Sequence, residues 1–264
     1  MKVGDLEVLP IVDGTGREQA REVLSAPGGG DRWACHPEHL DADGNLELTL
    51  GGFLLRTGDR VVLVDAGVGR IHNDHYAGGG FLDALDAHGV APGDVTDVVF
   101  THLHFDHVGW ATSKGQVVFD RATYRVHAAD WAHFVEAADA DPGAVRKLAP
   151  LRERLATFDA EHTVAPGLDA RPTPGHTPGS TSYVVSSHGE RALLIGDVAH
   201  SVVELEEPDW EAVFDVDPVA ARAMRNRIAD EVADTDDLVV PAHLPGLAVG
   251  RIVTFGDRRR VVIS

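Results

Sequence analysis

The chain has 264 residues, of which 44% are hydrophobic and 25% charged, a composition that is ordinary for globular proteins and excludes a disordered chain. Its 23 lysine and arginine residues against 42 aspartate and glutamate residues give a net charge of −19, which disfavours nucleic acid and anionic membranes as partners. A single cysteine, Cys35, excludes an internal disulfide framework and a thiolate zinc site.

Strands dominate the first half of the chain. Apolar runs bounded by turn residues predict strands over residues 6–12, 46–55, 61–65 and 98–100. The second and third of these strands flank a Thr-Gly-Asp turn at residues 57–59, which is typical of a hairpin. Apolar residues at Leu82 and Leu85, followed by Gly89, predict a short helix over residues 81–88.

The second half alternates between strands and helices. The predicted strands cover residues 116–119, 123–127, 182–186, 192–195, 238–241 and 251–255. The predicted helices cover residues 129–138, 144–155 and 217–232, and the last has Pro218 in its first turn. The order of strands followed by helices occurs twice along the chain. This pattern predicts one α/β (α+β) domain over residues 1–264, with two sheets packed face to face and helices outside.

The most informative stretch follows the strand at residues 98–100. It contains His102, His104, Asp106 and His107, and imidazole together with carboxylate suits zinc and neighbouring divalent metals. The alternate spacing of His102 and His104 places both on one side of an extended loop. Asp106 and His107 then turn toward a second position. The stretch therefore predicts a metal site, but four residues cannot complete two coordination shells.

Three further ligand-type residues lie downstream. His176 stands in a turn bounded by proline and glycine, and Asp197 and His243 each follow an apolar strand. A buried carboxylate without a partner would be costly, so Asp197 in particular calls for a cation. Each residue alone is a weak signal. Their shared position at the end of a strand predicts that they converge on the histidine-rich loop.

The order of these seven residues resembles the metallo-β-lactamase superfamily, and the resemblance spans nearly the whole chain. The Val-Asp-Ala-Gly sequence at residues 64–67 also resembles the Asp-x-Gly turn that precedes the motif in that family. The resemblance implies a four-layer αββα sandwich of two mixed sheets with two divalent metal ions at one edge. It implies that one metal is bound by His102, His104 and His176, the other by Asp106, His107 and His243, and that Asp197 bridges them.

Residues around the ligands narrow the branch of the family. β-Lactamases of the common class have a cysteine where Asp197 stands, and RNA-processing members carry basic or exosite segments that are absent here. Residues 101–110 and 196–200 are most similar to the lactonase and organophosphate-hydrolase branch. Quorum-signal lactonases have a tyrosine at the position of His200, which argues against a signal molecule as the substrate.

The resemblance implies a hydrolase that cleaves a carboxylic ester or a lactone by attack of a metal-bridging hydroxide. Zinc is the favoured ion, with manganese, iron and cobalt as alternatives. Asp106 is the candidate that orients the hydroxide or carries the proton, and His200 is a candidate acid or oxyanion donor, its alternative being a solvent-facing histidine. Aromatic residues that could contact substrate are Phe105, Trp110, Trp33 and Phe53.

Other functions remain open at this stage. A phosphotriester or thioester hydrolase would use the same metal ligands. A mononuclear iron persulfide dioxygenase would use a related set of ligands. A non-catalytic binding protein with a relic site is a third class. We expect a small-molecule substrate, no nucleic acid or membrane partner, and a homodimer as one option for the assembly. No apolar run approaches the ~18 residues of a membrane span and no signal peptide is recognisable, so we expect a cytoplasmic protein.

Overall fold

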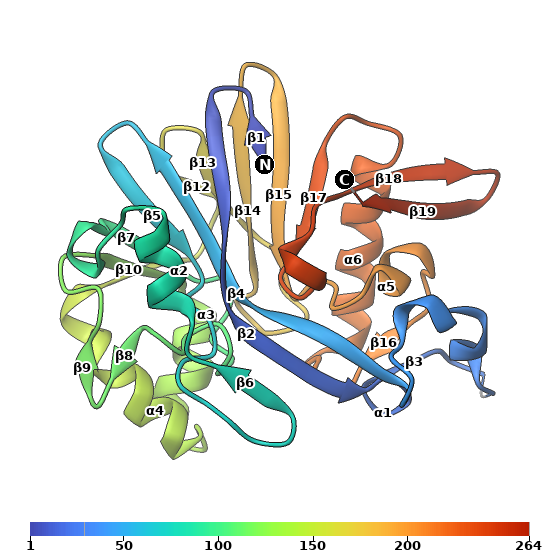
Figure 1. Cartoon of the computed structure of the whole chain (residues 1–264), viewed down its shortest axis with the longest axis horizontal. Coiled ribbons are helices and arrows are strands. Elements are labelled where there is room, and N and C mark those ends of the chain that lie inside the picture. Colours follow the sequence, from blue (N-terminus) through green and yellow to red (C-terminus); the bar gives the residue numbers. More distant parts are fainter. Residues whose placement is uncertain (29, 264) are drawn as a thin grey trace.

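Two large sheets form the centre of the structure, a computed structural model that describes residues 1–28 and 30–263 (Figure 1). The first sheet has eight strands, and seven of them follow the order β1 (Lys2–Val3), β2 (Leu6–Gln19), β4 (Asn45–Thr57), β5 (Arg60–Val64), β7 (Asp97–Val99), β10 (Thr123–His127) and β11 (Leu155–Phe158). The eighth strand, β6 (Tyr76–Gly78), pairs with β2.

The second sheet has seven strands in the order β12 (His162–Ala165), β13 (Leu168–Pro172), β14 (Thr181–Ser187), β15 (Glu190–Gly196), β17 (Leu238–Pro241), β18 (Gly250–Phe255) and β19 (Arg258–Ile263). Two short pairs lie outside these sheets: β3 (Leu24–Ser25) with β16 (Glu211–Ala212), and β8 (Thr112–Ser113) with β9 (Gln116–Val117). The α-helices are α1 (Ala20–Val23), α2 (Phe81–Ala87), α3 (Ala128–Trp131), α4 (Pro142–Leu148), α5 (Val202–Glu206) and α6 (Pro218–Val232).

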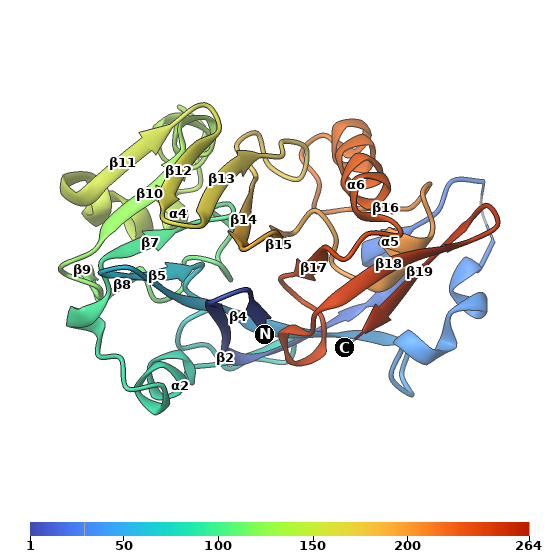
Figure 2. The ribbon, with the colours of Figure 1, turned by 90° about the horizontal axis from the view of Figure 1, so that it is seen from above.

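The side chains of β15 show how the layers are held together. Successive residues of a strand point to opposite faces. Leu194 therefore packs between the sheets, in a cluster with Val64 of β5, whereas Leu193 packs outward against Ile228 of α6. On the other outer side, Phe81 of α2 packs against the first sheet, and Figure 2 shows α2 and α6 on opposite sides of the strands. The predicted αββα sandwich is confirmed.

Several predicted elements differ in their limits. The helix expected over residues 144–155 is α4 followed by a 3-10 segment, Ala149–Arg154, because Pro150 lacks an N–H and cannot continue an α-helix. The helix expected over residues 129–138 is α3 followed by a π-helical turn, Ala132–Glu136. The strand expected to end at residue 12 continues to Gln19 through a register shift.

Strands β11, β12, β13 and β19 were not predicted, and the strand expected over residues 116–119 covers only Gln116–Val117. The outer strand β19 illustrates the difficulty. It begins with three arginines and leaves all six of its residues exposed or half-buried, so it lacks the apolar pattern of a strand that faces the core. Its pairing with β18 gives it its conformation.

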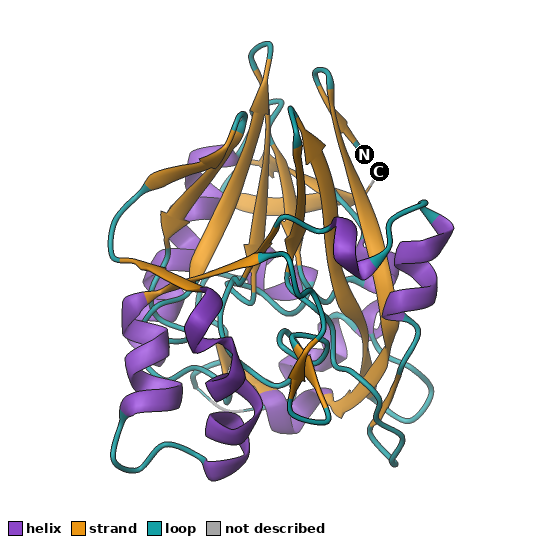
Figure 3. Cartoon of the chain, turned by 90° about the vertical axis from the view of Figure 1, so that its left-hand side faces the viewer, coloured by secondary structure: helices purple, strands orange, loops and turns teal. Residues whose placement is uncertain are grey.

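The topology brings the ends of central strands to one edge. β5 pairs with β7 in parallel, and β15 pairs with β17 in parallel, so the carboxyl ends of each pair lie side by side. The segments that follow β7, β15 and β17 contain six of the seven predicted ligands. Figure 3 shows loops gathered below the strands of the two sheets. In sheets with parallel strands this edge is where ligands usually bind.

Candidate metal centre

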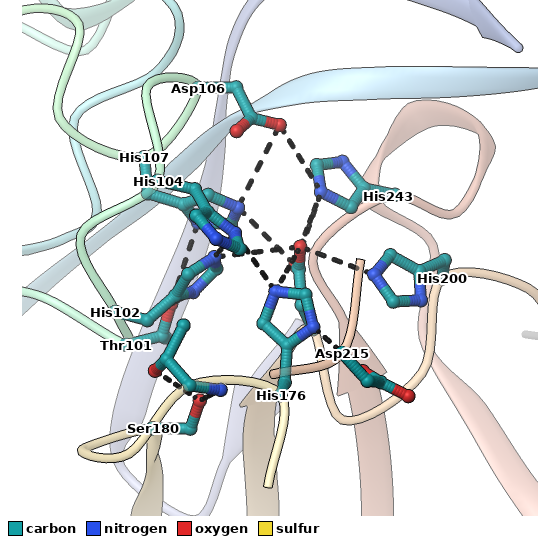
Figure 4. A network of polar contacts seen from close by, with 12 residues as sticks. Thr101, His102, His104, Asp106, His107, His176, Ser180, His200, Asp215 and His243 are labelled. Atoms are coloured by element: carbon teal, nitrogen blue, oxygen red, sulfur yellow. Dashed lines mark hydrogen bonds and ion pairs between the residues drawn. The ribbon is translucent and has the colours of Figure 1, made fainter. Parts of the chain in front are cut away.

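All seven predicted ligands converge at this edge (Figure 4). Four come from the loop after β7, His176 comes from the β13–β14 connection, and Asp197 and His243 follow the parallel strands β15 and β17. Their ligand atoms form two groups, and within each group all atoms lie within 4.8 Å of one another. The first group is His102, His104, His176 and Asp197; the second is Asp106, His107 and His243.

The first group has the spacing of a metal site. Nδ1 of His104 lies 3.0 Å from Nε2 of His102 and 3.0 Å from Nε2 of His176. Oδ2 of Asp197 lies 3.5 Å from Nε2 of His176. Four donors that each bind zinc at about 2.0–2.2 Å in a tetrahedron stand roughly 3.3 Å apart, so this group fits one such ion.

The second group shares Asp197 with the first. Oδ1 of Asp197 lies 3.3 Å from Nε2 of His107 and 3.1 Å from Nε2 of His243, and Oδ2 of Asp106 lies 3.5 Å from the latter atom. Nε2 of His107 and Oδ1 of Asp197 are buried without a hydrogen-bond partner. Orphaned polar atoms are costly in a protein interior unless something accepts their lone pairs. A divalent cation at this position meets that requirement.

Contacts from outside the groups orient the imidazole rings. Nδ1 of His107 lies 2.8 Å from the carboxylate of Asp65, and Nδ1 of His176 lies 2.9 Å from that of Asp215. Nδ1 of His243 lies 3.1 Å from a backbone carbonyl oxygen on β4. A partner at Nδ1 fixes the tautomer that leaves Nε2 free for a metal. The rings are thus held in their binding orientation by the protein itself.

Burial and neighbouring charge set the protonation of the first group. Burial, followed by the nearby His176, lowers the pKa of His104 to about 3. Burial and His107 also hold the pKa of His102 well below its ordinary value. For Asp197, burial favours the neutral form, but the surrounding histidines, His243 first, outweigh it and keep its pKa well below the ordinary value. Neutral imidazoles with an ionised carboxylate are the forms that bind metals.

In the second group, the net effect of burial and neighbouring charge raises the pKa of the histidines instead of lowering it. Burial lowers the pKa of His107 and of His243, but neighbouring carboxylates, Asp197 first, outweigh burial and raise both values. In the metal-free protein the neighbouring carboxylates therefore favour the protonated form of both rings. A cation bound in this group displaces those protons, which makes its binding dependent on pH.

His200 belongs to the same site. It is 5% exposed, and its Nε2 lies 3.5 Å from Oδ2 of Asp197 without a hydrogen-bond partner. Nδ1 lies 3.4 Å from Glu204, which also accepts a hydrogen bond from the His200 backbone N–H at 2.6 Å and contacts the buried Arg225. Burial lowers the pKa of His200, but Glu204 outweighs it and raises the pKa to about 9. The alternative of a solvent-facing histidine is therefore wrong.

A cavity of about 170 Å³ opens onto both groups. Besides ligands and His200, it is lined by Leu48, Tyr76, Phe105 and Phe214. Phe105 is 51% exposed and its ring lies edge-on to that of Tyr76, with centroids 5.2 Å apart. Tyr76 and Phe214 were not among the predicted residues, since neither lies near a ligand in the sequence.

The other three predicted aromatic contacts do not line this cavity. Trp110 is buried, and its Nε1–H donates a hydrogen bond to Asp13 at 3.0 Å. Trp33 packs edge-on against Trp210 at a centroid distance of 4.7 Å, and Phe53 is buried between the two sheets. We therefore assign these residues to the core and retain only Phe105 as a candidate for substrate contact.

Residues 52–243 match the metallo-β-lactamase superfamily. The chain belongs to this superfamily. An N-acyl homoserine lactonase of Bacillus cereus is 26% identical over 190 residues, which cover 64% of this chain and 72% of the lactonase. The metallo-beta-lactamase domain-containing protein 1 of Homo sapiens is 32% identical over 193 residues, which cover 72% of this chain and 60% of the human protein.

Solved structures agree with the fold. The dizinc quorum-quenching lactonase AidC, in complex with a product, superimposes with a TM-score of 0.89 at 24% identity, covering 100% of this chain and 96% of AidC. The hydrolase AbOPH of the same superfamily gives a TM-score of 0.85 at 24% identity, covering 99% and 95%. The predicted superfamily is confirmed, and the chain is a metal-dependent hydrolase of that superfamily that uses a divalent metal. Among the described residues, no helix is long and apolar enough to cross a membrane.

Proposed function

We propose that this protein hydrolyses a carboxylic ester, and in particular a lactone, with two divalent cations, zinc being the favoured metal. His102, His104 and His176 would hold one cation, Asp106, His107 and His243 the other, and Asp197 would contact both. The observation that carries the proposal is the position of Asp197, whose carboxylate contacts histidines of both groups. The lactonase relatives support the substrate class.

When bound, a pair of divalent cations lowers the pKa of a water molecule toward neutrality and polarises a carbonyl oxygen, which is the chemistry that hydrolysis requires. The protein supplies the rest. Asp106 is the more accessible of the two carboxylates, with 12% of its side chain exposed, and it lies at the cavity wall. It would accept the proton of the attacking water and pass it to the leaving alkoxide.

His200 would stabilise the negative charge that develops on the substrate oxygen. His200 lines the cavity, its Nε2 lies 3.5 Å from Oδ2 of Asp197, and Glu204 holds Nδ1 from behind, so the doubly protonated ring would present a fixed N–H. A preorganised donor in a site shielded from water is worth more than one in bulk water. This arrangement lets His200 take the place of the tyrosine expected in signal lactonases.

The small cavity favours a compact reacting group. A volume of about 170 Å³ lies below the range of roughly 300–1,000 Å³ that is usual for pockets that bury a whole drug-sized ligand. Its apolar wall, which includes Phe105, Phe214 and Leu48, suits the carbon skeleton of a lactone ring or small ester. We propose a small molecule as the substrate. A homodimer and a cytoplasmic location remain predictions, and light scattering would test the first.

A substrate panel tests the proposal. Metal-loaded protein is assayed against lactones, including N-acyl homoserine lactones, and against aryl esters, thioesters and phosphotriesters, in parallel with the metal-free protein. Lactone or ester turnover that requires metal is expected, together with loss of that turnover in His176→Ala. His162→Ala, on β12 and outside both ligand groups, is the matched control and should keep full activity.

The outcomes separate the remaining alternatives. Metal-dependent turnover confined to phosphotriesters or thioesters would reassign the substrate class while keeping the site. One iron per chain with oxygen consumption would replace the proposal by a persulfide dioxygenase. Intact metal binding without turnover of any substrate would leave a binding protein.

A further inference from the structure

A second cavity, of about 350 Å³, lies beside the metal cavity. His200 and His243 line both. Their rings are parallel, with centroids 6.1 Å apart, and Figure 4 shows them on the same side of the cluster. Leu46 and Leu48 stand two positions apart on β4 and so share one face of the strand; the first lines the second cavity and the other lines the metal cavity. The two cavities are thus neighbours along β4.

We call the second cavity the arm pocket. Its walls come from the turn Pro37–His39, β4, α5, the segment after β17 and β19. Figure 1 shows α5, β19 and the chain leading into β4 at the same end of the molecule. The apolar part of its lining is Leu40, Leu46, Val202, Leu244, Val261 and Ile263. Its volume falls within the range of roughly 300–1,000 Å³ that suits small ligands.

The polar part of the lining is strongly acidic. It contains Glu38, Asp41, Glu47 and Glu206, and among the described residues it contains no lysine or arginine. Side chains of Glu38 and Glu47 are 63% and 65% exposed, so these carboxylates stand at the rim. A cavity with apolar walls and a carboxylate rim attracts an apolar group with a positive end and repels one with a negative end.

Neighbouring cations compensate only part of this charge. Arg17 lies 3.9 Å from Asp41 and 3.7 Å from Glu47, and Arg260 forms an ion pair with Glu206. Both guanidinium groups lie outside the lining of the pocket. The nearest ionisable partner of Glu38 is His39, at 3.7 Å. Four carboxylates therefore face two guanidinium groups and the protonated ring of His200, whose charge is paired with Glu204, and a negative excess remains.

We propose that the arm pocket binds the substituent of the substrate, and that this substituent is an apolar arm with a positively charged end. The inference rests on the proposed function, because it assumes that the reacting ester or lactone ring occupies the metal cavity. The inference concerns the part of the substrate that does not contact the metal centre. The same acidic rim disfavours substrates whose arm ends in a carboxylate.

Four lactones of the same ring test this proposal. One has no arm, and three have the same alkyl arm ending in a methyl, trimethylammonium or carboxylate group. The ammonium arm should exceed the carboxylate arm in kcat/KM by about tenfold or more, since an uncompensated charge at about 8 Å changes binding roughly fivefold at intermediate screening. Raising the salt concentration to 1 M should reduce that ratio.

Two variants and one control variant locate the effect. In E38Q/E47Q the ratio between ammonium and carboxylate arms should fall at least threefold by the same Coulomb estimate. E153Q removes one exposed carboxylate from the 3-10 segment after α4, outside the arm pocket, and should leave the ratio unchanged. Ala248→Phe fills the arm pocket and should remove the advantage of the methyl arm over the lactone without an arm.

A binding measurement separates this proposal from the proposed function. If no lactone or ester is hydrolysed, the proposed function fails, and calorimetry with hexyltrimethylammonium and hexanesulfonate then tests the arm pocket alone. Binding of the ammonium compound that is tighter than that of the sulfonate and is weakened by Ala248→Phe supports the proposal. Equal kcat/KM for the two charged arms, or equal binding of the two amphiphiles, overturns it.

Discussion

Removal of the Asp215 carboxylate should weaken metal binding in the first group while leaving the fold intact. Oδ1 of Asp215 lies 2.9 Å from Nδ1 of His176, and Oδ2 is buried without a partner. Asp215 therefore holds the His176 ring in the tautomer that presents Nε2 to the other ligands. In Asp215→Ala the ring can rotate or change tautomer, and the metal affinity of the first group should fall roughly 10–100-fold, or about 1.4–2.7 kcal/mol.

The substitution should change the free energy of unfolding of the metal-free protein by less than it changes the free energy of metal binding. The substitution removes one hydrogen bond to a histidine, but it also removes a carboxylate oxygen that is buried without a partner. These two effects oppose each other, each being of the order of 1–3 kcal/mol. We expect a change in the free energy of unfolding of about 1 kcal/mol or less, measured by urea denaturation of the metal-free proteins.

Competitive titration with a chromophoric chelator measures the two metal affinities separately. The expected result for Asp215→Ala is one weakened site and one site of nearly normal affinity, while Asp139→Ala, which changes an exposed aspartate outside both ligand groups, behaves as wild type. Equal weakening of both sites would show that Asp215 acts through general structure. Two unchanged affinities would show that His176 does not need its outer partner, and the reasoning would be refuted.

Three further predictions concern His104, Asp13 and His200. In the metal-free protein, His104 has a pKa of about 3 when folded against an ordinary value of 6.5, so between these pH values the folded chain binds fewer protons and loses stability as the pH falls. From pH 6.5 to 5 this loss of stability is about 2 kcal/mol. The free energy of unfolding in urea should therefore fall by that much more in wild type than in His104→Ala over this pH range. Equal pH dependence of the two proteins would contradict the prediction. Asp13 accepts hydrogen bonds from Trp110 and three backbone N–H groups. Asp13→Ala should therefore lower the free energy of unfolding in urea by ~3 kcal/mol or more. A decrease below about 1 kcal/mol would show that these donors find other partners. His200→Gln should lower kcat roughly 10²-fold with unchanged metal content by elemental analysis, and a wild-type kcat would exclude its role as oxyanion donor.

The convergence of the candidate ligands was predictable because each one stands where an apolar strand ends or in a constrained turn. The apolar run before Asp197 and the one before His243 predict adjacent buried strands, and their ligands then emerge at the same edge. The outer partners were not predictable in this way. Asp215 lies 39 residues after His176 in an irregular segment, and no local pattern links it to the metal centre.

Aromatic residues show a second limit of the sequence. Phe105 and Trp110 are both close to the ligand loop, yet Phe105 points into the cavity and Trp110 points into the core. The difference arises because Asp13, 97 residues earlier, accepts the indole N–H of Trp110. Proximity in sequence does not determine side-chain direction on a loop, where neither the helical nor the strand period applies.

Elemental analysis of protein purified without added metal tests the central claim most directly. Wild-type protein should contain two divalent ions per chain. His243→Ala, which alters the second group alone, should contain about one, and Asp197→Ala, which removes the oxygens that both groups share, should contain fewer than either. A wild-type content of one ion per chain that is unaffected by the loss of His243 would contradict the pairing of the two groups through Asp197.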